Sequence, residues 1–127
     1  MYLLKVRYKK RLFMLAKTAK EFHAEKKGNC AESVAYAYLV SKNTSLNEME
    51  SALAEMKLCG GGRAPNGLCG ALYAALRFAK NENKQAIQEY FEKNVGGICC
   101  KDIRPAKITP CNRCVEIAAE AIEKLDT

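Results

Sequence analysis

The residues of this protein best suited to carry out chemistry are its cysteines. Its 127 residues include seven cysteines, no tryptophan and only one histidine, His23, which stands alone on an amphipathic segment. A thiolate is a nucleophile, a redox group and a ligand for soft metals and iron. No set of serine, histidine and aspartate and no pair of carboxylates suggests hydrolysis or acid–base catalysis. The chemistry therefore has to be built from sulfur.

The start of the chain does not look like a secretory signal. Charges interrupt its first apolar residues, and the apolar run 12–16 is too short for the core of a signal peptide. We therefore expect a cytoplasmic protein in a reducing compartment, where structural disulfides are disfavoured. An odd number of cysteines also leaves one thiol unpaired. Metal binding, an iron–sulfur cluster or redox chemistry is favoured over a disulfide scaffold.

Helical periodicity predicts the elements that must position these thiols. Apolar residues recur at helical spacing through most of the chain, and no segment alternates as a strand would. Asn29 with Glu32, and Ser45 with Glu48, form two capping-box patterns, while Asn83 and the Thr109-Pro110 pair are further helix starts. We expect an all-α, compact bundle of five to six helices, with no sheet, forming a single domain over 1–127. The expected helices cover 12–26, 30–40, 46–60, 68–80, 84–95 and 110–125.

Four of the predicted helix starts carry cysteines. Cys30 opens one helix, Cys69 lies in the first turn of another, Cys99 and Cys100 open a short turn, and Cys111 begins the last helix. Free backbone N–H groups and the helix dipole favour a thiolate at such positions. If the helix starts cluster at one end of the bundle, these sulfurs converge.

Cys111 and Cys114 form the chain's single Cys-x-x-Cys motif. At a helix start the two sulfurs suit either a dithiol–disulfide couple or half of a metal site. A second Cys-x-x-Cys is missing, which disfavours a zinc finger, and so is the closely spaced run of a ferredoxin. Any further ligands must come from distant helices, with the Gly60–Gly62 loop as a place where backbone can approach a cluster.

The net charge of +7 comes from the first 28 residues, which hold nine basic and two acidic residues. The remainder is neutral, with twelve of each sign, and lacks interleaved aromatic residues, so we do not expect nucleic-acid binding. We interpret 1–13 as a basic N-terminal arm and 14–127 as a cysteine-rich helical redox domain. No run approaches the roughly 20 apolar residues of a transmembrane helix.

Five segments in order resemble one protein family, and the resemblance covers about 16–125. They are Asn29–Val34, the Gly60–Gly62 run, Gly67–Leu72, Gly97–Ile103 and Cys111 with Val115–Glu120. This set is similar to the C_GCAxxG_C_C family of small bacterial and archaeal proteins to which redox activity is attributed. A similar cysteine-rich region occurs in split-Soret cytochromes, where it implies an iron–sulfur centre, although this chain lacks the Cys-x-x-Cys-His of covalent haem.

The resemblance implies that Cys30, Cys69, Cys100 and Cys111 are the site cysteines, and that Gly70, which follows Cys69 in the family's Cys-Gly-Ala element, belongs to the cofactor-binding site. Cys59, Cys99 and Cys114 are then additions in this chain. Ala74 stands where the family pattern has a glycine. Because Cys99 and Cys100 are neighbours, either of them can be the family's third cysteine.

Three hypotheses follow. In the first, the four cysteines bind an iron–sulfur cluster for electron transfer, which requires a redox partner protein. In the second, no cofactor is bound, and Cys111 or Cys114 attacks as the catalytic thiolate of a thiol–disulfide oxidoreductase. In the third, the same four cysteines hold zinc or a soft metal in a non-catalytic module. The sequence leaves the oligomeric state open.

Overall fold

The computed structural model describes residues 15–60, 62–103 and 111–126. The basic arm predicted over 1–13, the first residues of the helix predicted over 12–26, and the helix start predicted at Thr109-Pro110 lie outside these residues. All seven cysteines lie within them.

The fold is all-α, as predicted, but the described residues form seven α-helices rather than five or six. The additional helix is the single turn α7, whose amides of Asp102 and Ile103 bond to the carbonyl of Cys99 at 3.0 and 3.2 Å. One turn is too short to show a helical period in sequence. The helices are α2 (Leu15–Ala24), α3 (Cys30–Ser41), α4 (Leu46–Lys57), α5 (Gly70–Phe78), α6 (Lys84–Val95), α7 (Cys100–Ile103) and α8 (Cys111–Leu125).

Two 3-10 turns, η1 (Pro65–Gly67) and η2 (Asn81–Asn83), complete the described secondary structure, which contains no sheet. A single isolated antiparallel bridge joins Leu68 to Cys99. Asn83 does not cap α6 as predicted: its side-chain amide donates instead to Asp126 Oδ1 at 2.7 Å. The side chain of Asn83 is thus bonded to the distant carboxylate of Asp126 and not, as the local sequence predicts, to the start of α6.

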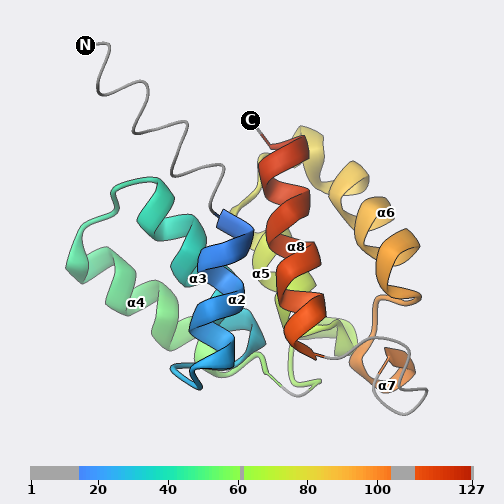
Figure 1. Cartoon of the computed structure of the whole chain (residues 1–127), viewed down its shortest axis with the longest axis horizontal. Helices are drawn as coiled ribbons and strands as arrows, with labels where there is room; N and C mark the ends of the chain where they lie inside the picture. The colour runs from blue at the N-terminus through green and yellow to red at the C-terminus, as the bar shows by residue number, and fades with distance from the viewer. Residues whose placement is uncertain (1–14, 61, 104–110, 127) are drawn as a thin grey trace.

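Helix α8 is the centre of the fold. It packs against α2, α3, α5 and α6, and Figure 1 shows it in red between α2 and α6. Three of its alanines are completely buried, which lets neighbouring backbones approach closely. Phe91 of α6 is the largest fully buried side chain of the core. Because α8 begins with Cys111, this packing fixes where that cysteine lies relative to α3 and α5.

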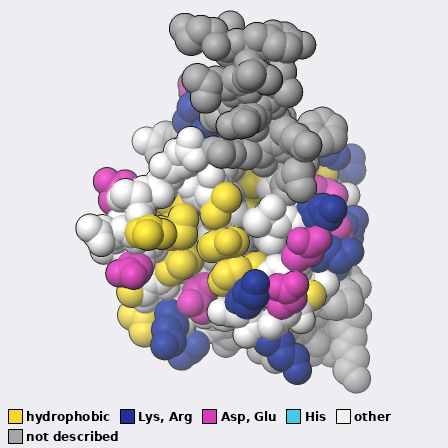
Figure 2. All heavy atoms as spheres, turned by 60° about the vertical axis from the view of Figure 1, so that its left-hand side comes forward, with side chains coloured by type: hydrophobic (Ala, Val, Ile, Leu, Met, Phe, Trp, Pro, Cys, Tyr) yellow, Lys and Arg dark blue, Asp and Glu magenta, His cyan; other side chains and the backbone are white. Residues whose placement is uncertain are grey.

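Helix α4 lies at the periphery and packs mainly on α3. It buries only Met56, and Leu46 and Leu58 at its two ends are 77% and 68% exposed. Figure 2 shows the side of the molecule that carries α4, where hydrophobic side chains gather between charged ones. None of the helices over the described ranges is long and apolar enough to cross a lipid bilayer.

Asn29 ties the start of α3 to the end of α4. Its side-chain oxygen accepts from the amide of Glu32 at 2.8 Å, and the Glu32 carboxylate accepts from the amide of Asn29 at 3.0 Å, so the predicted capping box is present. Its Nδ2 also donates to the carbonyl of Lys57 at 3.0 Å. One side chain therefore caps the helix that begins at Cys30 and fixes that helix against its neighbour.

We expect Asn29→Ala to lower the free energy of unfolding by about 2 kcal/mol, at the upper end of the cost of losing an N-cap. The loss exceeds that of an ordinary cap because the carbonyls at the end of α4 also lose their donor. Ser45→Ala is the matched control: Ser45 caps α4 through one bond of 3.3 Å to the amide of Glu48, and should cost about 1 kcal/mol or less. Urea unfolding of both variants checks this, and equal losses would contradict the second role of Asn29.

Candidate functional site

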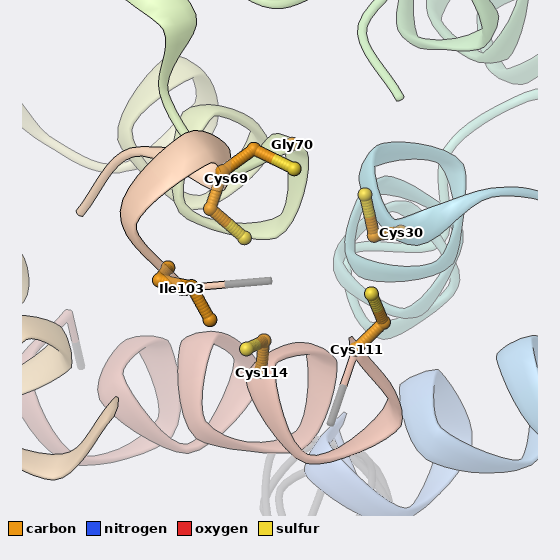
Figure 3. A pocket seen from close by; sticks show the side chains of 7 residues that line it. Cys30, Cys69, Gly70, Ile103, Cys111 and Cys114 are labelled. Atoms are coloured by element: carbon orange, nitrogen blue, oxygen red, sulfur yellow. The ribbon is translucent and has the colours of Figure 1, made fainter. Parts of the chain in front are cut away.

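Five cysteine side chains line one small cavity at the end of the bundle where several helices begin. They are Cys30, Cys69, Cys100, Cys111 and Cys114, and Gly70 and Ile103 complete the lining. The cavity has a volume of about 30 Å³. Figure 3 shows the labelled cysteines reaching it from α3, from the start of α5 and from α8. The four cysteines predicted to form the site are thus brought together, with Cys114 as a fifth.

Backbone pairing holds the segment that carries Cys100 against the start of α5. The amide of Cys69 donates to the carbonyl of Ile98 at 2.8 Å, beside the bridge between Leu68 and Cys99. Cys69 is the N-cap residue of α5 and Cys100 is the first residue of α7. A backbone contact between segments some thirty residues apart in sequence therefore brings Cys69 and Cys100 to the same cavity.

Gly70 leaves the space that the sulfur of Cys30 occupies. A Cβ built on Gly70 would lie 2.6 Å from Cys30 Sγ and 2.7 Å from the carbonyl oxygen of Cys59, both far shorter than van der Waals contact. Gly62 also approaches the site, since its Cβ would lie 3.8 Å from Cys100 Sγ, and its φ of +84° suits glycine. The Gly60–Gly62 loop is predicted to let backbone approach the site. Gly62 does lie beside a cavity cysteine, whereas Gly60 packs on Asn29.

The thiols of Cys69 and Cys114 contact each other inside the cavity. Their hydrogen bond lowers the pKa of Cys69 to about 7, against the opposing effect of burial, and the amides of Leu72 and Ala71 also favour the thiolate. The same hydrogen bond raises the pKa of Cys114, and burial raises it further. The hydrogen bond thus favours the thiolate on Cys69 over that on Cys114, and both side chains are buried, with exposed fractions of 7% and 2%.

Cys111 is the most exposed of the cavity cysteines. Its neighbour Asn112 makes a contact that the sequence does not indicate. The ring Nδ1 of His23 lies 3.1 Å from Asn112 Oδ1, joining the end of α2 to the first turn of α8. The single histidine, whose sequence context suggests no role, thus braces the Cys-x-x-Cys turn.

Cys59 and Cys99 are not among the residues that line the cavity. The thiol of Cys59 is buried against the carbonyl of Glu55 at 3.7 Å, and burial raises its pKa. The thiol of Cys99 lies 3.8 Å from the carbonyl of Asn66. Of the neighbouring cysteines 99 and 100, it is therefore Cys100 that belongs to the cavity.

The five side-chain donors around the cavity are all thiols, which is the ligand type that iron–sulfur clusters and soft metals take. Within the described residues, no three histidine, cysteine or acidic side chains are arranged to hold a single metal ion. A cluster separates its ligand sulfurs more widely than one ion does, since each thiolate binds a different iron. The cavity as it stands has room for about two water molecules.

Comparisons with family models, with curated proteins and with solved structures found no match for this chain.

Cys114 and Gly70, both predicted as site residues, line the cavity, but the packing that places them there could not be predicted from the sequence. The cavity position of Cys114 depends on which face of α8 meets α5, and the close approach of Gly70 to Cys30 depends on how α5 meets α3. The Cys-x-x-Cys spacing was the available indication for Cys114, and the Cys-Gly-Ala element was the indication for Gly70. Nothing in the sequence indicated Ile103 as the apolar member of the lining.

Proposed function

We propose that this protein is an electron carrier in which Cys30, Cys69, Cys100 and Cys111 bind an iron–sulfur cluster. The observation that carries the proposal is that one cavity gathers a thiol from each of four helix starts. The ordered resemblance to the C_GCAxxG_C_C family selects the same four residues. Bound there, a cluster would accept and release single electrons.

The chain's own residues would hold and tune such a group. Helix-start amides, such as those that already favour the Cys69 thiolate, stabilise negative charge on sulfur. Burial of Cys69 keeps water from that side, whereas Cys111 lies exposed. A redox partner protein would therefore approach on the side of Cys111, where the path between the site and solvent is shortest.

Anaerobic reconstitution with ferrous iron and sulfide tests the proposal. We expect brown protein that retains iron and acid-labile sulfide after gel filtration. The matched comparison replaces all four proposed ligands with serine in one chain and Cys59 and Cys99 in another. The first should lose bound iron almost completely and the second should keep it. Equal iron in both chains, or a colourless wild-type protein, would overturn the cluster.

The contact between Cys69 and Cys114 favours a second candidate, a thiol–disulfide oxidoreductase without a cofactor. In this alternative Cys111 or Cys114 attacks the substrate disulfide, and Cys69 is the resolving partner, since the hydrogen bond from Cys114 lowers the pKa of the Cys69 thiol. Turnover of a model disulfide substrate by metal-free protein, lost in Cys69→Ser, would support it. Elemental analysis of the same preparation addresses the third hypothesis, zinc or a soft metal bound by the four cysteines.

A further inference from the structure

The cavity contains one thiol more than a four-cysteine cluster requires. The extra thiol, Cys114, is 2% exposed and contacts the sulfur of Cys69, which the proposed function assigns as a ligand. A thiol that binds no metal and lies against a ligand has a different chemistry available, since two thiols in contact are one oxidation away from a disulfide.

Oxidants cannot easily reach this buried pair, but they can reach Cys111. Cys111 is exposed, whereas Cys69 and Cys114 are buried. Cys111 and Cys114 stand three residues apart in the first turn of α8, where side chains lie on the same face of the helix. Cys69, Cys111 and Cys114 all line the same cavity of about 30 Å³, so the exposed thiol and the buried pair open onto one small space.

We propose that Cys111, Cys114 and Cys69 form a relay that carries oxidation from solvent to a buried Cys69–Cys114 disulfide. The oxidant is a small-molecule disulfide, RSSR. Cys111 attacks RSSR, forms a mixed disulfide and releases one RSH, which takes the proton lost by Cys111. Cys114 then attacks the Cys111 sulfur and gives up its proton to the departing RS⁻, which leaves as the second RSH.

In the last step Cys69 attacks the sulfur of Cys114 and expels Cys111, which recovers its proton as a free thiol. Overall, Cys69 and Cys114 lose two electrons and two protons, and RSSR becomes two RSH. The final disulfide joins the two thiols that already touch, so no helix has to move far. Because Cys69 is then no longer available as a ligand, the disulfide would prevent cluster loading. Only this consequence rests on the proposed function.

The relay is tested by mixing the full, reduced, metal-free chain with oxidised glutathione. The reaction is quenched with an alkylating reagent, and the disulfides are mapped by peptide mass spectrometry. Wild-type protein should accumulate the Cys69–Cys114 disulfide. Cys111→Ser should form it at least about tenfold more slowly, because the accessible entry thiol is gone. Cys99→Ser, which removes a thiol outside the cavity, should react at the wild-type rate.

Two further variants should stop the relay at defined steps. Cys69→Ser should accumulate a Cys111–Cys114 disulfide, and Cys114→Ser should accumulate glutathione on Cys111, with circular dichroism confirming that both remain helical. An unchanged rate in Cys111→Ser would overturn the relay, as would a wild-type product joining Cys111 to Cys114.

Cluster loading separates this proposal from the proposed function. Oxidised wild-type chain should take up little iron and sulfide until it is reduced, whereas wild-type chain that was never exposed to glutathione should load fully. If the reduced chain also takes up none, the cluster fails while the mapped disulfide stands. If the oxidised chain loads as well as the reduced one, the blocking role fails.

Discussion

Gly70→Ala should lower the free energy of unfolding by about 3 kcal/mol and the melting temperature by roughly 10 °C. The added methyl group would lie 2.6 Å from Cys30 Sγ and 2.7 Å from the carbonyl oxygen of Cys59. The sulfur can rotate away, but the carbonyl belongs to the backbone, so the start of α5 has to move. Since that movement displaces Cys69 as well as Cys30, iron retained after anaerobic reconstitution should fall together with stability.

Gly97→Ala is the matched control for this prediction. Its added methyl group would make an ordinary contact of 3.4 Å with a side-chain carbon of Ile103, and its backbone does not have the positive φ of Gly96. It lies two residues before Cys99, close in sequence to the site. We expect less than about 1 kcal/mol of destabilisation and unchanged iron binding. A Gly70 variant as stable as this control would show that the two helix starts are not packed as tightly as described.

The local sequence predicts most of the helices because capping residues mark where a helix starts. Asn29 forms the predicted capping box at the start of α3, Ser45 caps α4 by accepting from the amide of Glu48, and both helices begin where expected. Asn83 shows the limit of this reasoning. Its side chain has a distant partner, Asp126, and a contact of that kind leaves no trace in the neighbouring residues. The one-turn helix α7 is not predicted either, because only a few hydrogen bonds between neighbouring residues form it.

The candidate site is predictable only as far as helix starts can locate it. Placing thiols at four helix starts selects Cys30, Cys69 and Cys111, and leaves Cys99 and Cys100 as alternatives. That these starts face one cavity is a property of packing, because α8 has to meet both α3 and α5 before Cys111 can approach Cys30 and Cys69. The fifth thiol, Cys114, enters the cavity for the same reason.

The pairing between the segment before α7 and the start of α5 decides between the two neighbouring cysteines. The Leu68–Cys99 bridge and the bond from the Cys69 amide to the carbonyl of Ile98 hold Cys99 in an extended, paired position. Cys99 lies in the paired segment, whereas Cys100 begins the helical turn α7, so the two neighbouring residues belong to different elements. One thiol is thereby directed to the carbonyl of Asn66 and the other to the cavity.

Cys100→Ser should therefore reduce iron affinity after reconstitution by at least about tenfold, whereas Cys99→Ser should leave it unchanged. The estimate takes the lower range for disturbing a metal site, since losing a ligand cannot cost less than losing one of its supports. Both variants replace one sulfur with oxygen and leave the backbone pairing intact, so unfolding free energies should differ little between them. Iron and sulfide analysis of the two proteins, prepared side by side, checks the prediction. A larger loss in Cys99→Ser would place the site on the other side of the bridge and remove Cys100 from the ligand set.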